Sequence, residues 1–152
     1  MNNLAQTIVE VIGSIKAVDA HQWDALVVGM PLLSHAFLAA LEISGSVGEG
    51  TGWAPCIITI RQHDALIGAI PLYIKSHSYG EYVFDWAWAD AYEQNGYAYY
   101  PKLLAAIPFS PITSTRLLAN DDETKLLLIE ELESAMQQHS LSSAHVLFPD
   151  DV

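Results

Sequence analysis

The stretch WAPCIITIRQHDALIGAIPLYI, residues 53–74, carries the clearest structural signal in this chain. It contains two β-rich runs, residues 53–61 and 66–74, separated by a polar turn at residues 62–65. Such a pair of runs around a short polar turn predicts a β-hairpin. Pro71 lies inside the second run and has no backbone N–H for a ladder, so we expect a bulge or a strand edge there that splays the sheet.

The rest of the chain predicts strands and helices on both sides of this hairpin. Hydrophobic spacing and capping residues indicate a strand at residues 7–15, helices at 21–28 and 35–44 opened by Asp19 and Ser34, a continuing strand at 82–84, a helix at 85–95, a strand at 103–107, a helix at 124–139 and a strand at 144–148. This order predicts a mixed α/β (α+β) fold, in which a mixed sheet with a central antiparallel meander is flanked by helices. We expect one domain over residues 1–152.

The composition predicts a cytoplasmic protein without a membrane span. Hydrophobic residues make up 51% of the chain, yet the longest apolar run is far short of the ~20 residues that a span needs. The first residues carry neither the basic flank nor the small-residue cleavage site of a signal peptide. The single cysteine, Cys56, lies in an apolar run and suits a reducing compartment.

Charge and histidine distribution argue against two kinds of site. A formal net charge of −12, with six scattered Lys and Arg residues, leaves no direct footprint for nucleic acid. The six histidines are dispersed, and a lone cysteine does not build a structural zinc site, so no metal site is predicted.

A candidate ligand site lies in residues 75–102, KSHSYGEYVFDWAWADAYEQNGYAYYPK. Nine of the fifteen aromatic residues of the chain fall between residues 79 and 100, interleaved with four acids. Aromatic walls that carry a few polar groups are typical of small-ligand pockets. Aromatic side chains also fill cores and interfaces, so a packing role stays open for each ring.

Three longer stretches are PLLSHAFLAALEISGSVGEGTGW (residues 31–53), PLYIKSHSYGEYVFDWAWADAY (71–92) and YYPKLLAAIPFSPIT (99–113). Together they resemble a bacterial family of FemAB-like proteins in the GNAT acyltransferase superfamily, often labelled peptidoglycan biosynthesis or recognition proteins. The resemblance implies a GNAT-like domain of an N-acyltransferase that transfers an acyl or aminoacyl group to a small-molecule or peptide-like amine acceptor, such as a peptidoglycan precursor. A non-catalytic GNAT-shaped module that binds a cell-wall precursor or a protein partner is the alternative.

Proteins of this family contain two GNAT-like halves, so the resemblance implies that residues 1–152 are the N-terminal half and that a C-terminal half is missing after a truncation near residue 152. For the full-length protein it implies acetyl-CoA or an aminoacyl-tRNA as donor. GNAT domains that use acetyl-CoA bind its pyrophosphate at a Gly-rich turn before a helix. The matching stretch, SPITSTRLLANDDETK (110–125), has no glycine and places three acids at the helix start. We therefore expect no cofactor in this half, and no activity from it alone.

Acyl transfer to an amine requires a proton acceptor, and Asp85 and His77 are the candidate catalytic residues. Asp85 lies between two aromatic residues, where partial desolvation is expected to raise its pKa and suit it to proton transfer. Its alternative role is the N-cap of the following helix. His77 and Ser78, in a loop with Tyr79, either orient a polar substrate or belong to a solvated loop.

The remaining candidates are expected to bind the substrate. Lys75 and Lys102 would hold a carboxylate or phosphate of a precursor, with a surface charge at a strand end as the alternative. Ser78 and Tyr79 belong to the same substrate-binding set. The wall of the predicted pocket is formed by Trp86, Trp88, Tyr99 and Tyr100.

Overall fold

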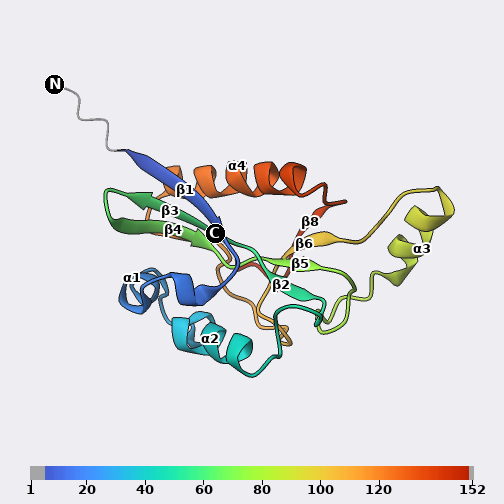
Figure 1. The fold of residues 1–152 in the computed structure, drawn as a ribbon, viewed down its shortest axis with the longest axis horizontal. Helices are drawn as coiled ribbons and strands as arrows, with labels where there is room; N and C mark the ends of the chain where they lie inside the picture. Colours follow the sequence, from blue (N-terminus) through green and yellow to red (C-terminus); the bar gives the residue numbers. More distant parts are fainter. Residues whose placement is uncertain (1–5, 151–152) are drawn as a thin grey trace.

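The computed structural model describes residues 6–150 and confirms the mixed α/β fold (Figure 1). The strands are β1 (Thr7–Ile12), β2 (Trp53–Pro55), β3 (Ile57–Gln62), β4 (Ala65–Ile70), β5 (Tyr73–Lys75), β6 (Lys102–Ala105), β7 (Leu118–Ala119) and β8 (Ala144–Val146). The helices are α1 (Ala20–Leu26), α2 (His35–Ile43), α3 (Trp86–Gln94) and α4 (Asp122–Gln138), with short 3-10 turns at Ile15–Ala17 and Pro31–Leu33. The strands form two four-stranded sheets, in the orders β1-β3-β4-β7 and β2-β5-β6-β8.

The predicted hairpin is present, but each of its two runs is divided between the sheets. β3 pairs with β4 in the first sheet, and β2 pairs with β5 in the second. The division falls at Cys56 in one run and at Pro71 and Leu72 in the other, where the backbone N–H of Cys56 still donates to the carbonyl of Leu72 at 2.8 Å. The expected splay at Pro71 is confirmed, because proline lacks the N–H that a continuous ladder would use.

Helices cover both faces of the first sheet (Figure 1). α4 packs on one face, and α1 and α2 pack on the other. Neighbouring residues of β3 point to opposite faces, so Ile57 joins the core beneath α1 and α2 while Ile58 joins the core beneath α4. Burial on both faces explains why residues 56–60 are nearly all apolar, with Thr59 as the one polar residue of the run.

The predicted helix starts at Asp19 and Ser34 are confirmed. Both side chains accept backbone N–H groups of the first turn, at 3.0 Å for Asp19 and 3.3 Å for Ser34. Asp121 caps α4 in the same way at 2.8 Å, so this helix begins at Asp122, before the predicted start at residue 124. Among residues 6–150, no helix combines the length and the hydropathy that crossing a bilayer requires.

Several of the predicted strands differ from the structure. The strands predicted at residues 103–107 and 144–148 end early, at Ala105 and Val146. The first strand ends at Ile12 instead of residue 15, and a 3-10 turn follows it. Residues 82–84 form no strand, because Tyr82 has a φ of +59°, in the left-handed region that a β-strand does not use. The two-residue strand β7 has no signature in the sequence, since it pairs only with Gly68 and Ala69 of β4.

The predicted helix at residues 85–95 is confirmed as α3, but it is not part of the core. None of its residues is buried. Figure 1 shows α3 at the end of an arm that leaves the second sheet after β5 and returns to it at β6. This arm contains the segment in which the candidate site was expected.

Candidate functional site

Two lysines face each other across the ladder that joins β5 and β6. Lys75 is the last residue of β5, Lys102 is the first residue of β6, and the two are direct partners in the antiparallel register. Both side chains are 0% exposed. Two ammonium groups withdrawn from water at neighbouring positions require anionic partners, because an unpaired buried charge is far too costly.

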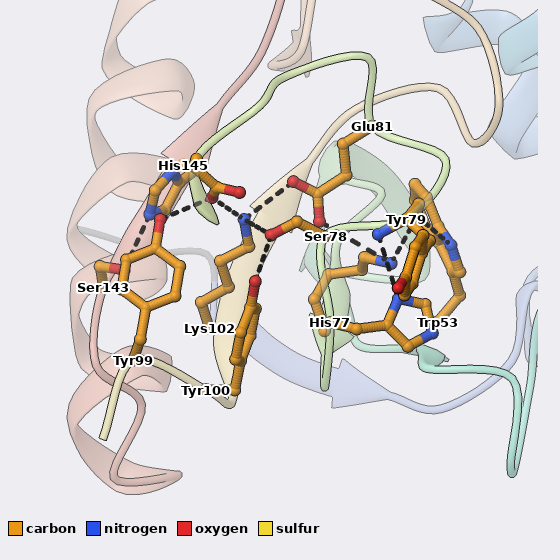
Figure 2. A network of polar contacts seen from close by, with 12 residues as sticks. Trp53, His77, Ser78, Tyr79, Glu81, Tyr99, Tyr100, Lys102, Ser143 and His145 are labelled. Atoms are coloured by element: carbon orange, nitrogen blue, oxygen red, sulfur yellow. Dashed lines mark hydrogen bonds and ion pairs between the residues drawn. The ribbon is translucent and has the colours of Figure 1, made fainter. Parts of the chain in front are cut away.

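The partners come from the loop that connects β5 to α3. Lys102 Nζ lies 2.8 Å from Glu81 Oε2 and 2.6 Å from Asp85 Oδ2, and Lys75 Nζ lies 3.7 Å from Glu81 Oε1 (Figure 2). All four side chains are buried. We refer to Lys75, Glu81, Asp85 and Lys102 as the buried tetrad. Its two cations and two anions balance, which is what allows this many charges to leave water together.

Three hydroxyl groups complete the contacts around Lys102 and Asp85. Lys102 Nζ donates to Ser78 Oγ at 3.0 Å, and Ser78 Oγ lies 2.6 Å from the hydroxyl of Tyr100. Tyr99 donates its hydroxyl to Asp85 Oδ2 at 2.6 Å. Burial, followed by the Asp85 carboxylate, raises the pKa of the Tyr99 hydroxyl, so it remains a donor over the physiological range.

Lys75 is held on its other side by Trp53. Its Nζ lies 3.7 Å from the centre of the Trp53 ring and donates to the Tyr79 carbonyl at 3.2 Å. The indole N–H of Trp53 donates to the same carbonyl at 3.1 Å. Sequence reasoning gave Trp53 no place in the site, because it lies more than twenty residues before the loop and only the β2–β5 pairing brings it beside Lys75.

Electrostatics divide the tetrad into two unlike pairs. Burial lowers the pKa of the Lys75 ammonium to about 8, although the Glu81 carboxylate opposes this. Burial also raises the pKa of Glu81. At Asp85 burial acts in the same direction, but the hydrogen bonds from Lys102 and Tyr99 outweigh it and lower the pKa to about 2. Desolvation thus acts on Asp85 in the expected direction, but the expected net rise of its pKa is wrong, because direct donors stabilise the charged form more strongly.

The alternative role predicted for Asp85 was to cap the helix that follows it, and the structure gives it that position without that function. It is the N-cap residue of α3, yet its side chain makes no capping hydrogen bond. The carboxylate turns to Lys102 and Tyr99 instead. Two buried oxygens of the tetrad, Asp85 Oδ1 and Glu81 Oε1, accept no hydrogen bond from the described residues.

His77 lies in the same loop but is not joined to the tetrad. Its Nδ1 accepts the backbone N–H of Tyr79 at 3.2 Å, so Nε2 carries the proton and donates to the carbonyl of Thr51 at 3.0 Å. Within residues 6–150, no hydrogen bond links His77 to Asp85, the other candidate catalytic residue. The ring instead ties this loop to the turn before β2, where only a glycine fits at position 52.

The four predicted wall residues divide between two grooves. Trp86, Tyr99 and Tyr100 line a groove of about 460 Å³ between α3 and the chain that leads into β6; the same groove is lined by Ala89, Asp90, Glu93, Tyr97 and Ala98. We call it the aromatic groove. Trp88 points to a second groove of about 450 Å³, and Tyr79 is 68% exposed beside His77.

His145 of β8 packs against Tyr99, one of the residues that line the aromatic groove. Its ring meets Tyr99 edge-on at 6.1 Å between centroids, and its Nε2 lies 2.8 Å from Ser143 Oγ (Figure 2). Burial, then the Lys102 charge, lowers the pKa of this imidazole, so it is neutral at pH values where an exposed histidine is partly charged. Its position far along the chain gave no sequence signal for this contact.

Glu81 is the central residue that sequence reasoning missed. It was one of four acids in the segment, and nothing in the local pattern distinguished it from the exposed Asp90 and Glu93. A signal existed in the two lysines: if Lys75 and Lys102 are read as neighbours on paired strands, two buried cations call for two nearby acids.

The fold and the site define a mixed α/β protein with a buried tetrad of charged residues next to the aromatic groove. A family model described as FemAB-like, peptidoglycan biosynthesis/recognition, matches residues 14–152, and the chain belongs to this family. No curated protein and no solved structure shows significant similarity to the chain. Membership of the GNAT superfamily and the position of the chain as an N-terminal half stay predictions.

Proposed function

We propose that this chain forms the acceptor-binding part of an N-acyltransferase that transfers an acyl or aminoacyl group to an amine of a peptidoglycan precursor. The FemAB-like family gives the peptidoglycan context. The chemistry comes from the tetrad and from the aromatic groove next to it. Tyr99 and Tyr100 connect the two, since each lines the groove with its ring and hydrogen-bonds to the tetrad side through its hydroxyl.

The observation that carries the proposal is the pair formed by Glu81 and Lys75. An acceptor amine arrives as an ammonium and must lose a proton before it attacks an acyl donor. Burial moves the pKa of Glu81 up and that of Lys75 down to about 8, so both move toward neutrality. A proton that passes between them leaves the net charge of the tetrad unchanged, and such opposed shifts mark groups suited to proton transfer.

Asp85 and His77 take binding roles in this proposal. A carboxylate with a pKa of about 2 is a poor proton acceptor at neutral pH. Asp85 is therefore assigned a binding role, in which its negative charge holds cationic groups such as the Lys102 ammonium. His77 positions the loop that carries Ser78 and Glu81 through its bonds to Thr51 and Tyr79. Lys102 holds Asp85 and Glu81 in place, and Lys75 completes the pair with Glu81.

The start of α4 does not suit a phosphate-bearing donor. Asp121 occupies the cap and accepts the backbone N–H of Thr124, and Asp122 and Glu123 follow it in the first turn. Three carboxylates at this helix start repel a pyrophosphate and use one of the N–H groups that would bind it. We assign the acyl donor, acetyl-CoA or an aminoacyl-tRNA, to a part of the natural protein other than this helix start.

Single substitutions in the natural protein test the function. Glu81→Gln is expected to lower the rate of acyl transfer to an amine-bearing peptidoglycan precursor by at least about a hundredfold, because it removes the proton acceptor. Glu133→Gln, an exposed acid of α4, makes the same chemical change away from the site and is expected to leave turnover unchanged. Turnover of folded Glu81→Gln within a factor of about two of wild type would refute the catalytic assignment.

A binding module without catalysis is the second candidate function. The exposed aromatic residues of the arm favour it, with Trp88 68% and Trp86 50% accessible. In that case Glu81→Gln and Asp85→Asn leave turnover of the natural protein intact, while Trp86→Ala weakens precursor binding. Loss of turnover with intact precursor binding in Glu81→Gln supports the enzyme instead.

A further inference from the structure

Glu81, the proton acceptor of the proposed function, lies behind the groove in which the acceptor amine is expected to bind. Its side chain is buried, and so is that of Asp85. Neither residue is among the described residues that line the aromatic groove. Because a proton passes only between groups at hydrogen-bond distance, a proton that leaves an amine in the groove must travel through other side chains to reach Glu81.

A continuous chain of hydrogen bonds connects the groove to Glu81 (Figure 2). The ring of Tyr100 lines the groove, and its hydroxyl lies 2.6 Å from Ser78 Oγ. Lys102 Nζ donates to Ser78 Oγ at 3.0 Å, and the same Nζ donates to Glu81 Oε2 at 2.8 Å. All three distances are within the range of a hydrogen bond, so the chain has no gap between the groove and the carboxylate.

The hydroxyl groups of Ser78 and Tyr100 are able to pass a proton in either direction. A hydroxyl donates one hydrogen bond and accepts two, whereas an ammonium only donates. Ser78 therefore accepts from Lys102 and still shares its own proton with Tyr100, and either oxygen of that pair can be the donor. Ser78 is 6% exposed, so bulk water has little access to the middle of the chain.

Tyr99 offers a second path from the groove to the tetrad, but this path ends at a weak base. Its ring also lines the groove, and its hydroxyl donates to Asp85 Oδ2 at 2.6 Å. A proton delivered along this path would have to reside on Asp85, and a carboxylate with a pKa of about 2 holds a proton poorly at neutral pH. The path through Tyr100 and Ser78 avoids Asp85.

We propose that the hydroxyls of Tyr100 and Ser78 relay the proton of the acceptor ammonium from the aromatic groove into the tetrad, where it ends on Glu81. The ammonium gives a proton to the Tyr100 oxygen as Tyr100 gives its hydroxyl proton to Ser78. Ser78 gives its own proton to Lys102 as Lys102 gives one to Glu81 Oε2. The three intermediate groups end in the protonation states in which they began, the Glu81 carboxylate becomes a neutral acid, and the amine keeps the electron pair with which it attacks. The inference rests on the proposed function, and it adds the path by which the amine is activated.

Time-resolved infrared spectroscopy tests the relay without an assay of acyl transfer. A laser pulse releases protons from a photoacid, and the carboxyl band of protonated Glu81 is followed, identified as the band that is missing from Glu81→Gln. Tyr100→Phe and Ser78→Ala are each expected to slow the appearance of this band at least about tenfold, because each breaks one link. Tyr82→Phe removes a 58% exposed tyrosine from the same loop, and this control is expected to leave the rate unchanged.

The double variant Tyr100→Phe with Ser78→Ala distinguishes a relay from two separate contributions. Two breaks in one chain stop the same proton, so the double variant is expected to be no slower than the slower single variant. Rates of the single variants within a factor of about two of wild type would overturn the relay, and so would effects that multiply in the double variant. Circular dichroism confirms that the variants remain folded.

The pH dependence of acyl transfer by the natural protein is a readout that a merely structural role would not move. Tyr100→Phe is expected to lower kcat at least about tenfold near neutral pH and to change KM less than about threefold, because its ring still lines the groove. This defect is expected to shrink as pH rises toward about 9, because an alkylammonium has a pKa of about 10 and more of the acceptor then arrives as the neutral amine.

The outcomes separate failure of the relay from failure of the proposed function. Turnover that depends on Glu81 but not on Tyr100, or a Tyr100→Phe defect that is constant with pH, would overturn the relay and leave the function intact. Infrared rates that follow the expected pattern in a protein without acyltransferase activity would retain the proton path and remove the function.

Discussion

The Nζ atom of Lys102 lies 2.6 Å from Oδ2 of Asp85, a residue 17 positions earlier in the chain. Lys102 begins a strand of the second sheet, whereas Asp85 ends the loop that leads into α3. The contact therefore joins the segment just before α3 to the first residue of β6, where the arm returns to the sheet. Because Lys102 is 0% exposed and Asp85 only 5%, water screens this ion pair very little.

Removing Lys102 is expected to destabilise the chain strongly. Lys102→Met leaves two buried carboxylates without their main partner, and breaking a buried pair from one side costs about 3–5 kcal/mol. Urea unfolding at neutral pH measures the loss. Lys125→Met, which removes the exposed ion pair with Asp122, is the control and is expected to change the free energy of unfolding by no more than about 0.5 kcal/mol. Similar small effects of both substitutions would mean that the tetrad does not stabilise the fold.

Asp85 is expected to make stability depend on acidity. Its pKa in the folded chain is about 2, below the ordinary value of 3.8, so the unfolded chain takes up the Asp85 proton first. This contribution is complete above the unfolded pKa and is lost as pH falls toward 2, for a total of about 2 kcal/mol. Asp85→Asn is expected to lack that part of the acid dependence in urea titrations. An unchanged difference between neutral and acidic solution in the variant contradicts the lowered pKa.

Lys75 is expected to make the free energy of unfolding depend on pH in alkaline solution. Because its pKa falls from 10.5 to about 8 on folding, the folded chain loses this proton first, and the free energy of unfolding rises with pH between these two values. The comparison is best made below about pH 9.5, before unfolded tyrosines ionise. Lys75→Met retains the tyrosines and Cys56, so only the Lys75 contribution disappears. Parallel pH profiles of the two proteins from pH 8 upward would contradict the prediction.

Gly52 is expected to be necessary for the position of His77. Gly52 and Gly96 have nearly the same backbone, with φ of +78° and +77°, but a Cβ at Gly52 overlaps the His77 ring whereas one at Gly96 meets nothing within 4 Å. Gly96→Ala thus reports the left-handed strain alone, about 1–2 kcal/mol. Gly52→Ala is expected to cost about 1–3 kcal/mol more in urea unfolding, because the ring must move.

A second substitution checks that cause. His77→Ala in the Gly52→Ala background removes the overlap, so it is expected to recover part of the lost stability. The same substitution in the wild-type chain removes the bonds to Thr51 and Tyr79 and is expected to destabilise. If His77→Ala has the same effect in both backgrounds, the two positions are not coupled.

Local patterns in the sequence determined most of the elements. The apolar run that contains Ile57 and Ile58 predicted a strand, the side chains of Asp19 and Ser34 predicted helix starts, and Pro71 marked the point where the sheet splits. Each of these signals acts within a few residues through sterics or a single hydrogen bond. These local signals did not predict that the two runs of the hairpin are divided between two sheets, because the other strands of each sheet lie elsewhere in the chain.

The sequence also shows that residues 75–102 concentrate aromatic, acidic and basic side chains, and its longer stretches carry the family resemblance. The contacts of those side chains, in contrast, depend on how distant segments pack together. Whether Lys75 and Lys102 lie on the surface or in the tetrad depends on the β5–β6 register, and whether Asp85 caps a helix or binds Lys102 depends on how the loop folds back. The pKa of a side chain depends on its burial and on the charges beside it, and both are supplied by segments far apart in the sequence. The pKa of Asp85 is therefore lowered, although its neighbours in the sequence predicted a rise.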